Sequence, residues 1–205
     1  KKNNPILIAT GASNSDDVDR AVKAILKFNN QICLMQCNTN YTIDKDKHKY
    51  VNLNVLKTYK KLYPNLILGI SDHTVENTTV LGAIALGARV IEKHFTFNKK
   101  KNGNDHYHST DFNDAFIMKK QIDKIYLLNG HNKKKVINCE KKSRLFARRS
   151  IVSNSDIKKN EIFNEKNLIT KRPGTGISPL LWNKIIGKRS KRNIKTDTQI
   201  QTKDF

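Results

Sequence analysis

The chain has 205 residues, and its 39 Lys and Arg against 18 Asp and Glu give a formal net charge of +21. That length allows one ordinary domain, or one domain with a small companion. The longest apolar runs, such as Ile32–Met35 and Leu66–Ile70, are far shorter than the roughly 20 residues that a membrane-spanning helix needs. We therefore expect no membrane partner. The first residues also show no signal-peptide pattern, so the cytoplasm is the expected location.

The excess positive charge predicts a surface that attracts anions. The basic runs Lys99–Lys101 and Lys133–Lys135 are short and contain no aromatic residue. Proteins that bind single-stranded nucleic acid combine a basic groove with aromatic rings that stack on the bases. We therefore expect no nucleic-acid partner, and composition alone leaves anionic small substrates as an open alternative.

The three cysteines, Cys33, Cys37 and Cys139, include no Cys-x-x-Cys pair of the kind found in zinc sites. Alternation along an apolar strand would place Cys33 and Cys37 on the same face. We interpret the cysteines as buried free thiols, which is consistent with a reducing compartment.

The first 130 residues alternate between strand patterns and helix patterns. Continuous apolar runs predict four strands, and apolar positions spaced by three and four residues predict four helices. The expected strands are Pro5–Thr10, Ile32–Cys37, Leu66–Ser71 and Val90–Phe95, and the expected helices are Asp16–Leu26, Val51–Leu62, Val80–Leu86 and Asp111–Leu128.

Strands that are apolar on both faces predict an α/β fold with a parallel sheet covered by helices on both sides. Short connections favour a (β/α) barrel over an open doubly wound sheet, and no Gly-x-Gly-x-x-Gly follows the first strand. A closed barrel needs eight strand–helix units and about 250 residues. The chain supplies four units, so these patterns leave two possibilities, an open sheet or half of a barrel.

We divide the chain into a partial barrel (1–130), a polar linker (131–142) and a small β-rich domain (143–205). In the small domain, Trp182 is expected to belong to the core rather than to a ligand site. Short β-type runs are expected to alternate there with single turns: the runs are Ser150–Val152, Asn167–Thr170 and Lys191–Ile194, and the turns include Asp156–Glu161 and Ser178–Ile186.

The ends of the third and fourth strands carry histidines. In barrels the reactive side chains lie at the C-terminal ends of the strands, and here His73 and His94 lie at the same depth on consecutive strands. Two neutral imidazoles that face one cavity are a candidate metal site. The alternative is that both histidines are structural.

Two further segments carry side chains that can bind substrates. The loop 102–109 brings Asp, His and Tyr over the same rim, with a solvated loop as its alternative. Arg172 precedes a Pro-Gly turn, and a guanidinium can bind a carboxylate or a phosphate with two hydrogen bonds. An ordinary surface arginine is the alternative.

Taken together, these motifs resemble the sialic acid synthase family. The resemblance covers essentially the whole chain, and its tail resembles the antifreeze-like (SAF) domain of that family. The barrel motifs are Ala9-Thr10-Gly11, Ser71-Asp72-His73-Thr74, Val90-Ile91-Glu92-Lys93-His94-Phe95-Thr96 and Gly103-Asn104-Asp105-His106, and the tail motifs are Arg149–Val152, Lys171–Pro179 and Ile186–Lys188.

The resemblance implies an enzyme that condenses phosphoenolpyruvate with N-acetylmannosamine or a related N-acetylated hexosamine. The products would be phosphate and a nine-carbon 2-keto sugar acid. It also implies the C-terminal half of a TIM (β/α)8 barrel followed by the SAF domain, in a homodimer that exchanges its SAF domains. By the resemblance, His73 and His94 would bind Mn²⁺ or Mg²⁺, and phosphoenolpyruvate would be bound by Thr39, Asn40 and Ser71. Tyr41 and Asp105 would bind the sugar, and Asp105 is the catalytic candidate. Arg172 would bind the sugar from the partner chain.

The chain departs from the family pattern at several positions near this site. Ala9 replaces a usual Ser, Thr42 and Asn104 each replace a common Pro, and His106-Tyr107-His108 replaces commoner small residues. The identity of the sugar substrate is therefore left undecided by the sequence. A legionaminic or pseudaminic acid precursor is one alternative substrate, and a non-catalytic remnant that serves as an interaction module is an alternative function.

The resemblance begins at what would be the fifth strand of the barrel. We therefore expect the 205-residue chain by itself to have little or no synthase activity. Turnover of phosphoenolpyruvate and an N-acetylated hexosamine by the purified chain, at an ordinary enzymatic rate, would contradict this expectation.

Overall fold

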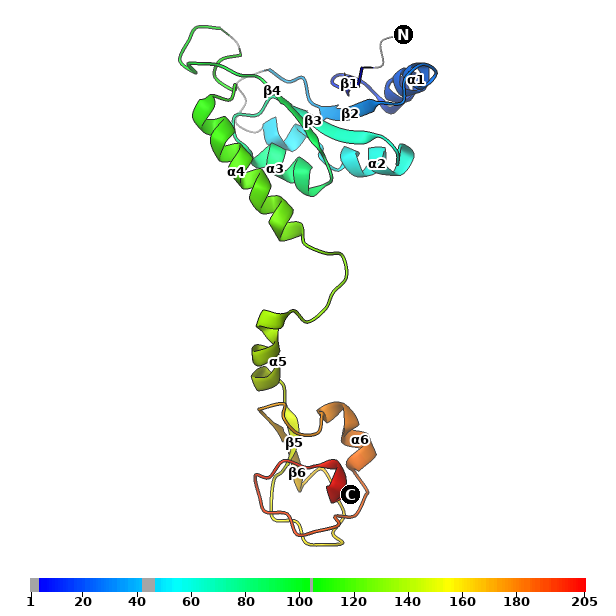
Figure 1. The fold of residues 1–205 in the computed structure, drawn as a ribbon, viewed down its shortest axis with the longest axis vertical. Helices are drawn as coiled ribbons and strands as arrows, with labels where there is room; N and C mark the ends of the chain where they lie inside the picture. The colour runs from blue at the N-terminus through cyan, green and yellow to red at the C-terminus, as the bar shows by residue number, and fades with distance from the viewer. Residues whose placement is uncertain (1–3, 42–46, 104) are drawn as a thin grey trace. The chain divides into compact units, whose positions relative to one another are not determined.

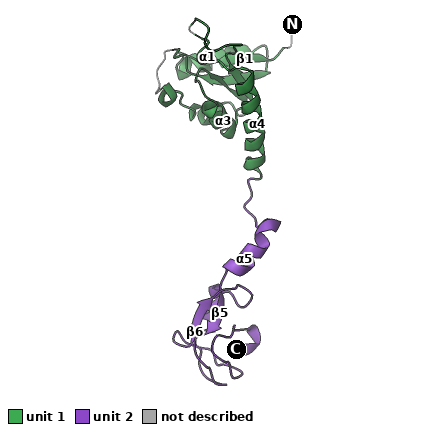
Figure 2. Ribbon diagram, turned by 90° about the vertical axis from the view of Figure 1, so that its left-hand side faces the viewer, with its two compact units in different colours: residues 1–131 green, residues 132–205 purple. Residues whose placement is uncertain are grey.

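The computed structural model of the chain describes residues 4–41, 47–103 and 105–205. It consists of two compact units, residues 1–131 and residues 132–205, and each is described by itself (Figures 1 and 2). Across the described residues, no helix has the length and apolar character needed to cross a membrane.

The first unit is a parallel sheet in the order β1-β2-β3-β4, and a helix follows each strand (Figure 1). The predicted parallel pairing is therefore confirmed. The strands are β1 (Ile6–Ala9), β2 (Ile32–Cys37), β3 (Ile67–Asp72) and β4 (Val90–Lys93), and the helices are α1 (Ser15–Leu26), α2 (Val55–Leu62), α3 (Thr78–Ala85) and α4 (Phe112–Asn129).

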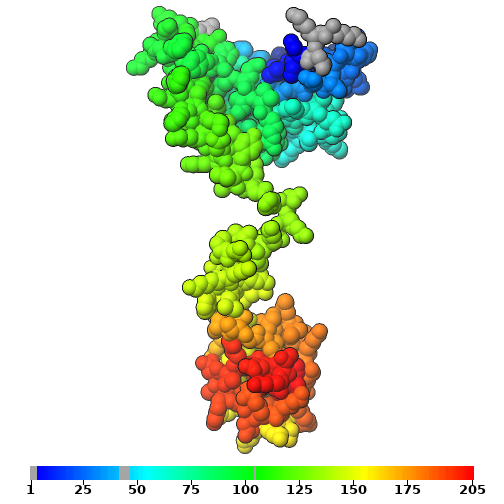
Figure 3. Space-filling model, viewed as in Figure 1, coloured from blue at the N-terminus to red at the C-terminus, as the bar shows by residue number. Residues whose placement is uncertain are grey.

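The two central strands are the most buried part of the sheet. Every residue of β2 is buried, and in β3 only Ile67 is exposed. β1 and β4 lie at the two edges, and every second side chain of β1 is exposed; its dark-blue atoms reach the surface in Figure 3. Because their side chains pack on both faces, β2 and β3 give the residues that follow them a rigid support.

Several element boundaries differ from the prediction, including the start of α2 and the end of β4. α2 begins at Val55 rather than Val51, because Asn52 has a φ of 52°, which a helix does not accommodate. The residues before it form a 3₁₀ helix instead, Lys47–Tyr50. β4 ends at Lys93, so His94 lies just past the strand, and Phe95 forms an isolated bridge with Thr110.

The apolar stripe predicted for α4 is only partly buried. Ile122 packs with Val80 and Ile84 of α3, whereas Phe112 and Phe116 are 78% and 60% exposed. The helix begins with a capping box, in which Asp111 accepts a hydrogen bond from the backbone of Asp114 and the carboxylate of Asp114 accepts one from Asp111.

The second unit contains a two-stranded antiparallel sheet, β5 (Ser150–Ser153) and β6 (Leu168–Lys171), and the helices α5 (Lys141–Ala147) and α6 (Trp182–Ile185). Trp182 packs against the core of this unit, as predicted. The expected third strand at Lys191–Ile194 is wrong, because within the described residues this segment makes only the single bridge Ile157–Ile194. The buried core is made of Ile151, Ile157, Phe163, Leu168, Ile185, Ile194 and Ile200.

The cysteines follow the prediction in two of three cases. Cys33 and Cys37 are buried free thiols, and burial raises the pKa of Cys33 to about 11. Cys139 is also free, but it is exposed rather than buried, because it lies in the short 3₁₀ helix Asn138–Glu140, which has no buried residue.

An ion pair holds the C-terminal end of the second unit. The fully buried carboxylate of Asp204 accepts hydrogen bonds from Nε of Arg192 at 2.7 Å and from the backbone of Gln201 at 2.9 Å. Burial by itself raises the pKa of Asp204, but the hydrogen bonds from Arg192 and Gln201 lower it by more than that. The pKa of Asp204 therefore lies below its usual value. A carboxyl of this kind stabilises the fold above its unfolded pKa of about 3.9, and the stabilisation is lost as the pH falls through the lower folded value.

We therefore expect Asp204→Asn to lower the free energy of unfolding by about 1–3 kcal/mol at pH 7. The substitution should also make stability less dependent on pH below about pH 4. Urea unfolding at pH 7 and at pH 3 measures both effects, with Glu165→Gln at an exposed position as the control. Equal stability of Asp204→Asn and the control at pH 7 would show that the pair does not stabilise the fold.

Candidate metal and substrate-binding site

Polar side chains gather where β2, β3 and β4 end. Tyr41 follows β2, His73 follows β3 and His94 follows β4, while Asp105 and His108 lie in the loop before α4. The carboxyl ends of parallel strands meet at one edge of a sheet. This edge is therefore where the first unit assembles its candidate site.

The two predicted metal ligands lie side by side. Asp72 of β3 pairs in register with Lys93 of β4, so the residues that follow them, His73 and His94, occupy matching positions. Their ring centroids are 5.2 Å apart. The ring of Tyr41 covers them, with its centroid 4.6 Å from that of His73. The predicted proximity of the histidines is thus confirmed.

The orientation of His73 suits a metal ligand. Its Nδ1 lies 2.9 Å from the carbonyl oxygen of Asn38, so Nδ1–H can donate to that carbonyl. A bond of this kind leaves Nε2 with a free lone pair and is typical of metal-bound histidines. Burial lowers the pKa of His73, and this keeps the ring neutral and able to bind a cation at neutral pH.

Hydrogen bonds to the carboxylate of Asp72 hold the turn that carries His73. The carboxylate of Asp72 accepts hydrogen bonds from the backbone nitrogen of Thr74 at 2.9 Å and from Nζ of Lys93 at 2.6 Å. The side chains of Lys93 and Asp72 are only 4% and 1% exposed. This buried ion pair positions the backbone on each side of His73.

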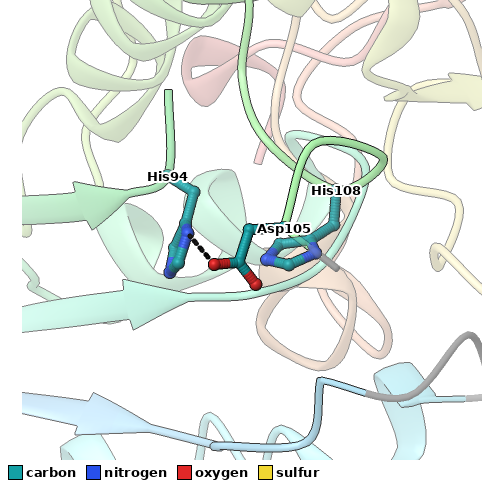
Figure 4. A group of neighbouring side chains, drawn as sticks. All are labelled: His94, Asp105 and His108. Atoms are coloured by element: carbon teal, nitrogen blue, oxygen red, sulfur yellow. Dashed lines mark ion pairs between the residues drawn. The ribbon is translucent and has the colours of Figure 1, made fainter. Parts of the chain in front are cut away.

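The loop before α4 adds two more donors. Nδ1 of His94 and Oδ2 of Asp105 are 3.8 Å apart. The ligand atoms of His94, Asp105 and His108 all lie within 4.8 Å of one another, and the carboxylate lies between the two rings (Figure 4). Within the described part of the chain, this is the group of three or more His, Cys, Asp or Glu residues that could hold a metal ion.

His108 was not among the predicted site residues. Its ring is fully buried, and neither ring nitrogen has a hydrogen-bond partner among the described residues. Burial lowers the pKa of His108 to about 4, so the ring is neutral at neutral pH. The available signal was its position three residues after Asp105, but a loop pattern does not reveal which way a side chain points. A buried, unpaired imidazole and two further donors fit a divalent cation.

The residues expected to bind phosphoenolpyruvate border two neighbouring spaces. Thr39 and Asn40 line an open cavity of about 970 Å³ beside the ends of β1 and β2. Asn40 also borders a much smaller space of about 10 Å³, which is lined by Ser71 and His73. Oγ of Ser71 donates a hydrogen bond to Glu92 at 2.7 Å, and the prediction did not assign Glu92 to the site.

Gly11 allows the segment after β2 to approach β1 closely. A Cβ at position 11 would lie 2.3 Å from Cγ2 of Thr39, so any larger residue there would displace Thr39. Asn38 then fixes the segment, because its amide donates to the carbonyl of Tyr50 at 2.8 Å and its side-chain oxygen accepts from the backbone of Asn40 at 2.9 Å. Thr42 and Asn104, two of the noted departures, lie outside the described residues.

A buried lysine lies beside the histidines and was also missed. Lys47 is 5% exposed, and its Nζ donates to Oη of Tyr107 at 3.1 Å. Oη of Tyr107 in turn donates to the carbonyl of Tyr41 at 3.2 Å. A lysine in this place supplies positive charge to a site that could receive an anion.

Arg172 belongs to the second unit. It follows β6, and its Nε donates to the carbonyl of Ala147 at 3.0 Å. Its predicted contact with a sugar in the site of a partner chain stays a prediction.

Comparisons with known proteins assign both units to families. The profile of the NeuB family matches residues 1–134, and that of the SAF domain matches residues 148–205. The chain is 37% identical over 204 residues to the N,N'-diacetyllegionaminic acid synthase of Campylobacter jejuni, covering 98% of this chain and 60% of that protein. It is 26% identical over 202 residues to the human N-acetylneuraminate-9-phosphate synthase, covering 98% and 55%.

A solved structure shows the same relation. The spore coat polysaccharide biosynthesis protein spsE of Bacillus subtilis has a TM-score of 0.57 and 32% identity, with 98% of this chain and 61% of that chain covered. The chain thus spans about three fifths of the length of these relatives. Its parallel sheet and its second unit fit part of a TIM barrel followed by a SAF domain. From the matched residues and the shared fold, the chain belongs to the NeuB family, whose named relatives are sialic and legionaminic acid synthases, and it carries a SAF domain.

Proposed function

We propose that the chain is part of a sialic acid synthase-type enzyme that condenses phosphoenolpyruvate with the open-chain aldehyde of an N-acetylated hexosamine. In this reaction the methylene carbon of phosphoenolpyruvate bonds to the aldehyde carbon, whose oxygen takes up a proton. Water adds to the neighbouring carbon that carries the phosphate, and the carbon–oxygen bond to phosphate then breaks, which gives a nine-carbon 2-keto sugar acid. The observation that carries the proposal is the convergence of His73 and His94 at the carboxyl edge of the sheet.

In the proposed mechanism, His73 and His94 hold a divalent ion, Mn²⁺ or Mg²⁺. When bound, such an ion polarises a carbonyl oxygen as a Lewis acid. The chain's own residues orient the ligands: the carbonyl of Asn38 holds the ring of His73, and the ion pair of Asp72 with Lys93 holds the turn. Among described residues, the unpaired ring nitrogens of His108 also support a cation in this place.

Asp105 is the proposed catalytic group. Its side chain is 56% exposed and lies next to His94, so it can reach both a bound sugar and the reacting aldehyde. As a carboxylate it accepts a hydrogen bond from a sugar hydroxyl, and it is placed to exchange a proton with the oxygen that becomes a hydroxyl. Tyr41, whose ring packs against His73, would contact the sugar from the other side.

Phosphoenolpyruvate carries two anionic groups, and the site offers donors for them. Thr39, Asn40 and Ser71 provide hydroxyl and amide groups, and Lys47 contributes a positive charge close to His73. In the proposed homodimer the SAF domains are exchanged, and Arg172 of one chain binds the sugar in the site of the other. A fork of guanidinium donors suits the oxygen atoms of such a sugar.

The sugar acceptor is tested by comparing three hexoses. We propose N-acetylmannosamine or the precursor of legionaminic or pseudaminic acid, and the 37% identity to a legionaminic acid synthase supports the second choice. The test measures phosphate release from phosphoenolpyruvate with each hexose, using protein isolated from its natural source with an antibody to the SAF domain. Release with one hexose, together with a 2-keto acid in the mass spectrum, is the expected result. No release with any of the three would refute the proposed function.

A further inference from the structure

His108 is a buried polar side chain without a partner. Its ring is fully buried, and both ring nitrogens lack a hydrogen bond to any described residue. Buried polar atoms in folded proteins nearly always have partners, and an exception calls for an explanation such as an unseen ion. The ring contacts Tyr107 at a centroid distance of 4.8 Å, but an aromatic contact does not satisfy a ring nitrogen.

The surroundings of His108 supply the other ligands of a metal. Its ring centroid is 5.0 Å from that of His94 and 6.0 Å from that of His73. The carboxylate of Asp105 lies between His94 and His108 (Figure 4). Two imidazoles and one carboxylate thus place their ligand atoms within 4.8 Å of one another, and the ring of His73 lies beside them, whereas the predicted site consisted of the imidazoles of His73 and His94 alone.

The position of His108 in the chain explains its direction. The backbone nitrogen of Thr110 donates to the carbonyl of His94 at 2.7 Å, and Oγ of Ser109 donates to the carbonyl of Asp105 at 2.6 Å. These bonds fold the loop back onto the end of β4. His108, which lies between the two anchored segments, is thereby directed toward the ring of His94.

We propose that His108 is a further protein ligand of the divalent ion, together with His94 and Asp105, so that a probe cation that prefers imidazole reports its contribution most strongly. Imidazole ligands suit Zn²⁺, Co²⁺, Ni²⁺ and Fe²⁺, whereas Mg²⁺ and Mn²⁺ prefer carboxylate, carbonyl and water oxygens. The inference deepens the proposed function, because it adds a ligand to the same site.

The alternative roles of His108 are less consistent with the geometry. A proton relay from His108 would require a hydrogen bond, and its ring nitrogens have none to a described residue. A purely structural role would leave both nitrogens buried and unsatisfied, which packing does not compensate.

The test uses Co²⁺ and Mg²⁺ as probes of the 205-residue chain. We compare wild type with His108→Ala, and His131→Ala serves as the matched control because His131 is exposed. Titration is expected to show at least a 10-fold loss of Co²⁺ affinity in His108→Ala, with the affinity for Mg²⁺ little changed. The visible spectrum of bound Co²⁺ should also change, and X-ray absorption of the Zn²⁺ form should show one imidazole fewer. His131→Ala should behave as wild type.

Equal Co²⁺ affinity and equal spectra for wild type and His108→Ala would overturn the inference, as would the absence of Co²⁺ binding by wild type. If His108→Ala loses its far-UV circular dichroism and is therefore unfolded, the same X-ray absorption measurement is made on His108→Gln. Glutamine is closer to histidine in volume, and the number of imidazole ligands in that variant then decides the question. The proposed function is refuted by a different result from the one that refutes the metal ligand. Metal binding that depends on His108, without phosphate release from any of the three hexoses, would refute the condensation and leave the metal ligand in place.

Discussion

Replacing His94 with alanine is expected to lower kcat/KM for the condensation by on the order of 10³-fold, because a metal that polarises a carbonyl contributes several kcal/mol to the transition state. His94 is central among the candidate donors, since its ring centroid lies 5.2 Å from that of His73 and 5.0 Å from that of His108. Its loss should therefore affect the site more than the loss of any one of those donors. Phosphate release measured on the protein produced from its own gene tests this expectation.

The control for His94→Ala is His131→Ala, which removes an exposed imidazole outside the site. Both variants are also titrated with Mn²⁺ in the 205-residue chain. We expect the affinity for Mn²⁺ to fall at least 10-fold in His94→Ala alone. An unchanged rate of phosphate release in His94→Ala would contradict the metal mechanism, and so would an equal loss in both variants.

Replacing Lys93 with methionine is expected to lower the free energy of unfolding by about 3–5 kcal/mol. Lys93 donates to Asp72 at 2.6 Å, and both side chains are almost fully buried. Methionine retains much of the volume but removes the charge, so the carboxylate of Asp72 would remain buried without its counter-ion. The loss of an ion pair at the surface has a far smaller effect, typically below 1 kcal/mol.

Urea unfolding of Lys93→Met measures this difference, with Lys119→Met as the matched control. Lys119 also pairs with an aspartate, Asp123 at 2.6 Å, but the two side chains are 70% and 56% exposed. If Lys93→Met destabilises the chain no more than Lys119→Met does, the buried pair does not hold the turn of His73.

The arrangement of the strands could be predicted because burial leaves a simple trace in the sequence. β2 and β3 are almost fully buried, and their continuous apolar pattern indicates the parallel sheet that the structure shows. The expected cover of helices on both faces is wrong, because α1, α2 and α3 pack on the same alternate residues of these strands. Once the strands are parallel, matching positions on neighbours must lie together. For this reason the proximity of His73 and His94 followed from spacing alone.

Features that depend on single backbone angles and on side-chain direction could not be predicted. The start of α2 was placed too early, because the positive φ of Asn52 depends on the loop around it. Lys191–Ile194 has the composition of a strand, but its described part has one bridge partner, Ile157, instead of a neighbouring strand.

A similar reason explains why sequence patterns did not identify three of the residues at the site. Lys47 and His108 are polar residues that lie buried beside the predicted ligands, and Glu92 is an exposed residue that accepts a hydrogen bond from Ser71. Burial of a loop residue depends on how the loop folds back on the sheet, and hydrophobic periodicity does not report on that. The motif around Asp105 identified the right loop, but the burial of His108, three residues after Asp105, could be seen only in three dimensions.

The carboxyl edge of the sheet is proposed to hold a metal ion between His73 and His94. Anomalous diffraction from crystals of the protein grown with Mn²⁺ tests this proposal most directly, because the data locate the ion without reference to activity. We expect one strong peak at roughly 2.0–2.3 Å from a ring nitrogen of each histidine. A map with no peak between these two rings, or with its only strong peak elsewhere in the protein, would contradict the account.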